Sequence, residues 1–267
     1  MKKYKICKIL LVILAIFLCV AFYELLGICV AYKKQPEVSN TTKKETKNGS
    51  WNECSENTER AVIIEKNPEA LLQRVRLIKN AKKEIILSTF AFQSDESGKL
   101  ILGALHDAAD RGVHIRLLVD GMESWIDMEG NPYFYGLSSH ENVEIKLYNK
   151  ANPLKPWKMM GRMHDKYLIA DGKRYILGGR NTYNYFLGDF PGHKNYDRDV
   201  LVVCDEPEKE NSVNQLLEYF ETIWEQEDSG YFHDNKKLAN RKSVKNAVLE
   251  LQNGYQKYFE ENKERIC

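Results

Sequence analysis

Residues 162–181 carry the sequence RMHDKYLIADGKRYILGGRN. Within it, residues 163–170 and 173–177 are two strand-like runs of mostly apolar residues. Asp171-Gly172 joins them, and this dipeptide is one of the strongest signals for a two-residue hairpin turn. The segment is therefore predicted to form a β-hairpin inside a larger sheet.

The chain on both sides of this hairpin alternates between strands and helices. Asn67 is expected to cap a helix that has Pro68 at its first position. The first half of the folded part follows a β-α-β-α-β order, which predicts an α/β fold with a mixed β-sheet and flanking helices. Strands are expected at 61–65, 84–92, 113–119, 143–148 and 199–204, and helices at about 67–81, 97–111, 213–224 and 244–259.

An apolar run from Ile9 to Tyr32, with Glu24 as its one charge, follows a basic flank at residues 1–8. A helix over this run covers roughly 36 Å, which is enough to cross a bilayer. A cleaved signal peptide is the competing interpretation, but the run exceeds the usual ~7 to 15 apolar residues of such a peptide. We therefore expect a retained transmembrane anchor at 9–32. Lysines flank both of its ends, so the side of the membrane stays open.

The rest of the chain divides into a polar linker at 33–59, a catalytic domain at 60–230 and a C-terminal helical extension at 231–267. With 43% hydrophobic and 29% charged residues, the composition is that of a globular protein and excludes wholesale disorder, collagen and coiled coil. Six cysteines without a C-x-x-C pair predict neither a zinc site nor a disulfide framework, and no cofactor is expected.

His164 and Lys166 are two positions apart on a predicted strand, so their side chains share one face. This pair suits a phosphate, because the imidazole can attack phosphorus or accept a proton while the ammonium neutralises the phosphate oxygens. The hairpin brings Gly178-Gly179-Arg180-Asn181 back beside that face. There the glycines allow a ligand to approach closely, and the Asn181 amide can donate to a phosphate oxygen.

The segment from His164 to Asn181 spells H-x-K-x4-D-x6-G-G-x-N, and on this signature the chain resembles the phospholipase D superfamily. The resemblance continues at STFAF (88–92), DESG (95–98) and AADRGVHIRLLVDG (108–121). These stretches look like the N-terminal half of bacterial cardiolipin synthases, over roughly residues 60 to 230. The resemblance implies a phospholipase D-like half-domain and a metal-independent phosphodiester reaction through a phosphohistidine.

By the same resemblance, His164 is the catalytic imidazole and Lys166, Gly179 and Asn181 are on the phosphate side of the site. Asp171 is either part of the site or holds the hairpin turn by hydrogen bonds to backbone amides.

An imidazole also needs a partner that fixes its tautomer. Asp197 is the expected acid for His164, and Asp199 is the other candidate.

The family builds one site from two motifs, in one chain or in two subunits, and this chain has one motif. The other histidines are in no H-x-K arrangement: His106, His114, His140, His193 and His233. Two chains could pair their His164 residues as a homodimer, another polypeptide could carry a second motif, or the chain could be an inactive half. The homodimer is favoured.

The predicted function is that of a membrane-anchored phosphodiesterase or phosphatidyltransferase acting on phospholipid. The alternatives are a single-motif nuclease and a non-catalytic half that binds lipid or a partner. Nucleic acid is disfavoured, because residues 33–267 hold 35 Lys and Arg against 37 Asp and Glu. Basic residues do gather at 150–180, and the loop at 153–160 could rest on lipid head groups or pack in the core.

Overall fold

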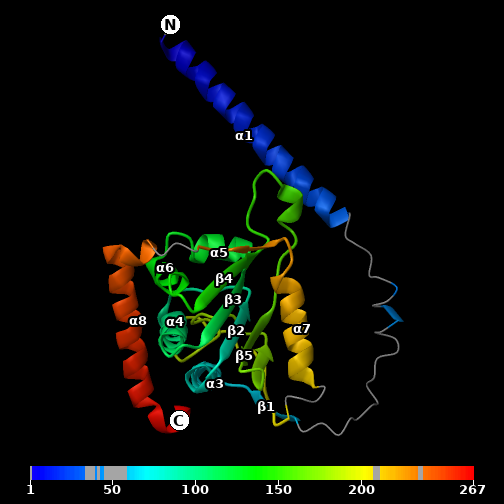
Figure 1. Ribbon diagram of the computed structural model, residues 1–267. Coiled ribbons are helices and arrows are strands. Elements are labelled where there is room, and N and C mark those ends of the chain that lie inside the picture. The colour runs from blue at the N-terminus through cyan, green and yellow to red at the C-terminus, as the bar shows by residue number, and fades with distance from the viewer. Residues whose placement is uncertain (1, 34–39, 41–42, 45–58, 207–210, 234–236) are drawn as a thin grey trace. The chain divides into compact units, whose positions relative to one another are not determined.

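The computed structural model describes residues 2–33, 40, 43–44, 59–206, 211–233 and 237–267 (Figure 1). Most of the predicted linker at 33–59 lies outside these residues. The chain forms two compact units, one from Met1–Ser55 with Ala151–Arg162 and the other from Glu56–Lys150 with Met163–Cys267. The loop at 151–162 thus belongs with the N-terminal helix and interrupts the predicted catalytic domain.

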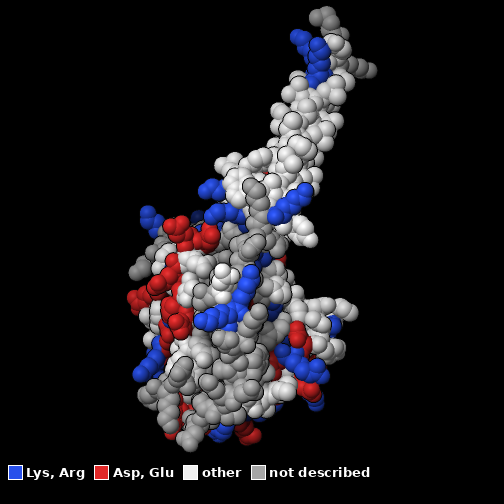
Figure 2. Space-filling view, turned by 90° about the vertical axis from the view of Figure 1, so that its right-hand side faces the viewer, with Lys and Arg blue, Asp and Glu red and all other residues white. Residues whose placement is uncertain are grey.

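The first unit contains α1 (Lys2–Lys33) and η1 (Pro156–Lys158). Its 30-residue stretch Tyr4–Lys33 contains an 18-residue window with a mean hydropathy of 2.9 and is long and apolar enough to cross a membrane. The middle of α1 is apolar on its surface, with lysines at both ends (Figure 2). This helix is a candidate membrane anchor.

The second unit is built on an eight-stranded mixed sheet with the order β1-β7-β6-β5-β2-β3-β4-β8. β2, β3 and β4 pair in parallel, and all other neighbours are antiparallel. The strands are β1 (Glu59–Ile64), β2 (Glu84–Thr89), β3 (His114–Asp120), β4 (Val143–Tyr148), β5 (Lys166–Ala170), β6 (Arg174–Gly178), β7 (Asp199–Cys204) and β8 (Ser229–Tyr231).

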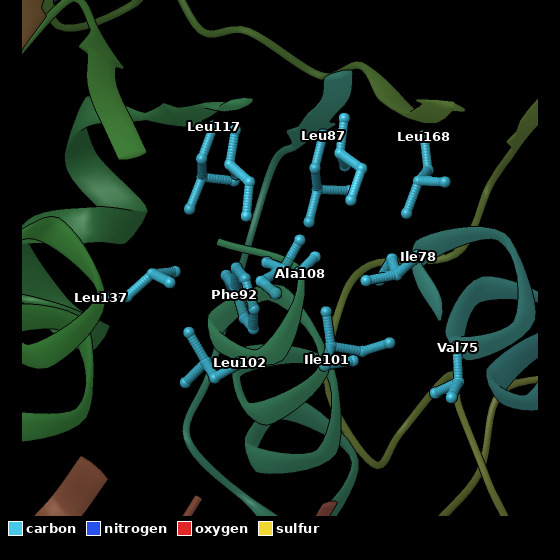
Figure 3. Close-up of a cluster of buried hydrophobic side chains, with 14 of the residues drawn as sticks. Val75, Ile78, Leu87, Phe92, Ile101, Leu102, Ala108, Leu117, Leu137 and Leu168 are labelled. Carbon is cyan, nitrogen blue, oxygen red and sulfur yellow. The ribbon is translucent and has the colours of Figure 1, made fainter. Parts of the chain in front are cut away.

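Helices cover both faces of the sheet, as alternating strands and helices predict. On one side, α3, α4, α6 and α8 close over the larger core, part of which is drawn in Figure 3. On the other side, α7 covers a smaller core that includes Val213 and Phe220. The helices are α3 (Asn67–Asn80), α4 (Glu96–Asp110), α5 (Gly121–Asp127), α6 (Pro132–Ser138), α7 (Ser212–Trp224), α8 (Lys242–Glu261) and α9 (Lys263–Ile266), with η2 (Leu238–Asn240) between β8 and α8.

The C-terminal helix α8 is an integral part of this unit. Leu251 and Tyr255 are buried in the larger core, and the backbone of α8 approaches Gly103 of α4 so closely that a Cβ there would lie 2.6 Å from the Leu251 carbonyl oxygen. The apolar face expected at 244–259 is therefore used inside the domain.

The fold class is the one predicted, an α/β fold with a mixed sheet, but three local expectations differ. The strand expected at 84–92 ends at Thr89. The strand expected at 163–170 begins only at Lys166. Asn67 lies inside α3 and makes no capping bond, because its side chain donates to the Asn195 carbonyl (2.8 Å) and accepts from Arg180 (3.2 Å).

Candidate active site

The candidate active site lies where several strand ends meet at one edge of the sheet. Thr89, the last residue of β2, pairs with Lys166, the first residue of β5. Gly178, the last residue of β6, pairs with Asp199, the first residue of β7. β3 ends at the same edge, because it runs parallel to β2. The signature residues of the β5–β6 hairpin are thereby collected with the residues that follow β2 and β3.

His164 and Lys166 come together although His164 precedes the strand. The Lys166 ammonium lies 3.1 Å from His164 Nδ1 and donates to the His164 carbonyl oxygen at 2.7 Å. The Phe90 ring packs on the imidazole, with 4.6 Å between ring centroids, and the same ring lies 5.4 Å from Lys166 Nζ. His164 is exposed, while Lys166 is buried. An accessible imidazole is thus held beside a largely desolvated ammonium.

The segment that leads into the motif is fixed by Asp120 at the end of β3. One carboxylate oxygen accepts from the Met163 amide at 3.0 Å. The other accepts from the amides of Met122 and Glu123, which caps α5. This one buried side chain therefore sets the position from which His164 projects.

Gly178, Gly179 and Asn181 form a second wall, which we call the glycine shelf. A Cβ on Gly179 would collide with the Asp197 carboxylate, so only glycine leaves room for that acid. The Asn181 side-chain oxygen accepts from the Ala91 amide at 3.3 Å, which ties the shelf to the segment after β2. Asp197 therefore lies at the shelf. In this chain Lys166 Nζ lies beside His164 Nδ1. The role of Asp197 as the acid that orients His164 therefore stays a prediction.

Asp199, the other candidate for that role, is buried in a network of charges. Its carboxylate lies 2.8 Å from Arg74 and 3.2 Å from Arg180. Arg180 also donates to the carbonyl oxygens of Ile64 and Glu65. Asp199 is fully buried, and removal of one partner from such a pair would leave an uncompensated buried charge. The structure thus gives Asp199 a scaffolding position under the shelf.

Asp171 lies at the other end of the hairpin from His164. It adopts a left-handed conformation (φ 54°) in the turn, and its carboxylate accepts from the backbone amides of Lys82, Lys83 and Glu84 at 2.7–3.1 Å. The length of β5 separates it from His164 and Lys166. The structure does not bring this predicted site residue to the others, and its contacts are those of a residue that fixes the turn.

A model of the family described as "Cardiolipin synthase, PLD-like domain" matches residues 74–224, which is more than half of the chain. The chain belongs to the phospholipase D superfamily. The matched range contains both halves of the candidate site, the β5–β6 hairpin and the ends of β2 and β3.

Curated relatives match this phospholipase D-like chain over part of their length. An uncharacterised protein from Helicobacter pylori strain J99 is 31% identical over 206 residues, 72% of this chain and 38% of the relative. Cardiolipin synthase C of Escherichia coli K12 is 29% identical over 171 residues, 59% of this chain and 34% of the relative. The chain therefore spans little more than a third of these relatives.

Two solved structures share the fold. Phosphatidylserine synthase from Haemophilus influenzae aligns with a TM-score of 0.53 and 18% identity, over 81% of this chain and 48% of the other. NucT from Helicobacter pylori aligns with a TM-score of 0.50 and 16% identity, over 65% of this chain and 99% of the other. At such identities the likeness concerns the phospholipase D fold alone.

Three residues of this phospholipase D site escaped the sequence analysis. In the sequence, Phe90 and Asp120 stand out only as members of the family-like stretches 88–92 and 108–121. Their positions at the ends of predicted strands could have indicated that they lie near the site. Asp165, between the two motif residues, accepts from the Tyr219 hydroxyl of α7 at 2.9 Å. Burial and this bond raise the pKa of Tyr219 to about 12, so the phenol stays a donor.

Burial lowers the pKa of Lys166, and the nearby carboxylates of Asp165 and Asp197 oppose that shift. Among the residues that the structure describes, no three His, Cys, Asp or Glu side chains gather as a metal site.

Proposed function

We propose that the protein is a membrane-anchored phosphodiesterase or phosphatidyltransferase that acts on phospholipid. The observation that carries this proposal is the pair of His164 and Lys166 at 3.1 Å, with the Phe90 ring packed on the imidazole. Membership of the phospholipase D superfamily and the candidate anchor α1 support it.

In the proposed first step, His164 attacks the phosphorus of the phosphodiester. A P–N bond forms, the P–O bond to the leaving alcohol breaks, and an imidazole acting as acid protonates that alcohol. Lys166 neutralises the charge that builds on the phosphate oxygens, and Asn181 donates to them from the shelf. In the second step, the imidazole that gave up its proton takes one from water or an alcohol, whose oxygen attacks phosphorus. The P–N bond breaks, and His164 is free again.

The acid that protonates the leaving group is proposed to be His164 of a second copy. The chain carries one H-x-K motif, and the chemistry needs a nucleophile and an acid at the same phosphate. A pair related by a two-fold axis would supply both from the same residue. A second polypeptide with its own motif is the other source.

Phospholipid is favoured over nucleic acid as substrate for two reasons. The candidate anchor would keep the enzyme at a membrane, and the chain outside it has no overall basic charge. A single-motif nuclease is the second candidate, because in fold this chain covers 99% of NucT. A non-catalytic half that binds lipid or a partner is the third.

The deciding experiment assays the full chain in vesicles of equimolar phosphatidylcholine and phosphatidylglycerol. Turnover of phosphatidylglycerol, followed by mass spectrometry, is compared with cleavage of DNA oligonucleotides, for wild type, His164→Ala and His114→Ala. His114 is the control because it starts β3, at the opposite end of the sheet.

We expect lipid turnover that disappears in His164→Ala and persists in His114→Ala. DNA cleavage with the same pattern would establish the nuclease instead. If neither substrate reacts and His164→Ala still binds vesicles, the result would support the third candidate, a non-catalytic half that binds lipid.

A further inference from the structure

The loop at 151–162 is docked on α1 at a defined place. The Tyr23 hydroxyl donates to the Leu154 carbonyl oxygen at 2.9 Å. Gly27 lies directly under Pro156, so that a Cβ on Gly27 would come within 2.5 Å of the proline ring. The helix is exposed along most of its length, and Gly27 is buried. The only glycine of α1 thus provides the seat for the loop.

The position of this seat along α1 sets its depth in a bilayer. From Ile9, the first residue of the apolar run, a helix rising ~1.5 Å per residue reaches Gly27 after roughly 27 Å. The hydrocarbon core of a bilayer is about 30 Å thick. If α1 spans the membrane, Gly27 and the loop seated on it lie where the acyl chains meet the head groups.

The side chains of the loop suit that location. Leu154, Trp157 and Met160 are 78%, 46% and 50% exposed, which is unusual for large apolar side chains in a folded segment. Residues 151–162 also carry Lys155, Lys158 and Arg162 and no Asp or Glu. Apolar side chains with a tryptophan among them, flanked by cations, are the composition of segments that lie in the interface of an anionic membrane.

We propose that residues 151–162 form a membrane-contact loop whose partner is an anionic lipid surface. Leu154, Trp157 and Met160 enter the boundary between head groups and acyl chains, and the basic residues bind lipid phosphates. The proposal rests on the anchor role proposed above for α1. It also deepens the proposed function, because the loop ends two positions before His164 in the sequence.

The test uses Trp157 as its own probe. The full chain is reconstituted in vesicles of equimolar phosphatidylcholine and phosphatidylglycerol, with bromine on the acyl chains as a quencher of nearby tryptophan. We expect Trp157→Phe to remove most of the lipid-quenchable fluorescence. Trp125→Phe is the matched control, because Trp125 is 65% exposed but belongs to the other unit. An unchanged quenched fraction in Trp157→Phe would overturn the proposal and indicate that protein covers the loop.

A second pair of variants tests the seat itself. Gly27→Leu should push the loop off α1 and reduce the quenching of Trp157, whereas Ala15→Leu places the same side chain at an exposed position of the helix and should not. Equal quenching in both variants would contradict docking at Gly27.

Anchor and loop are separated in the same samples. The intact mass of 31.0 kDa and resistance to alkaline carbonate extraction report on the anchor alone. If the chain stays in the membrane but Trp157 is not quenched, the proposed membrane-contact loop is overturned and the anchor role of α1 stands. A cleaved or extracted chain overturns both.

Discussion

The two ends of the β5–β6 hairpin carry residues of one signature in opposite environments. At the open end, His164 is exposed and its Nδ1 lies 3.1 Å from the ammonium of Lys166. At the turn, three backbone amides donate to the Asp171 carboxylate. A group that meets a substrate needs hydrogen-bonding capacity that the protein leaves unused. A group that fixes a turn uses that capacity on the protein itself.

A spacing signature therefore mixes two kinds of constraint, chemistry at one end and scaffolding at the other. The same division separates Asp197 from Asp199, two positions apart. Asp199 is paired with Arg74 and Arg180 under the shelf, whereas Asp197 faces Gly179 at the site. Substitutions at the two ends should thus affect different measurements.

The largest effect is expected at the open end, from Lys166→Met. Loss of a donor to the transition-state oxygens should lower kcat by ~10²–10³-fold. The urea midpoint should be unchanged or higher, because the substitution removes a buried charge. Lys173→Met, at an exposed position beside the turn, is the control and should leave kcat unchanged. A large fall in the stability of Lys166→Met would contradict the assignment of a chemical role to the open end and a structural role to the turn.

The turn should show the reverse pattern in Asp171→Asn. Asparagine tolerates the left-handed conformation at φ 54°, so the change tests the hydrogen bonds alone. Weaker acceptance from the amides of Lys82, Lys83 and Glu84 should lower the free energy of unfolding by about 1–2 kcal/mol. Urea denaturation measures the loss. The kcat of the folded protein should be unaltered, and a hundredfold fall would return Asp171 to the catalytic site.

The sequence predicted the fold well where local signals agreed with the tertiary structure. Hydrophobic period and turn residues located the hairpin and the β-α-β-α-β order, and the expected ranges 143–148 and 199–204 match β4 and β7. Asn67 was misjudged, because its capping chemistry is used by Arg180, which is distant in the sequence. The short helices α5 and α6 and strand β8 carry too few residues for a periodic pattern.

For the site, spacing identified His164, Lys166, Gly179 and Asn181 but could not show what surrounds them. Phe90 contacts His164 only because β2 and β5 pair in the register that joins Thr89 to Lys166. The register between β2 and β5 is a tertiary property, so it cannot be predicted from the spacing of residues within the β5–β6 hairpin.

A smaller effect should separate the two ends in mixed assemblies. If two copies of His164 build one site, wild type is co-expressed with an equal amount of His164→Ala. The rate per total protein should then be about one quarter of the wild-type rate, because only pairs with two intact histidines react. Co-expression with Asp171→Asn should leave the rate nearly unchanged. A rate of one half with His164→Ala would mean that each chain acts without the other's histidine, and the homodimeric site would be wrong.

The smallest expected effect is a displacement of the pH profile. In the proposed mechanism Lys166 acts in its charged form, so activity should be lost as pH rises through its pKa. Burial lowers that pKa below the ordinary lysine value of 10.5, and the carboxylates of Asp165 and Asp197 partly restore it. Asp165→Asn removes a negative charge that favours the ammonium, so its alkaline limb should move to lower pH. Asp171→Asn, which changes a carboxylate at the far end of the hairpin, should leave that limb where it is. The pH dependence of kcat/KM for the three proteins measures both shifts. An equal displacement in the two variants would mean that the open end and the turn are not electrostatically distinct.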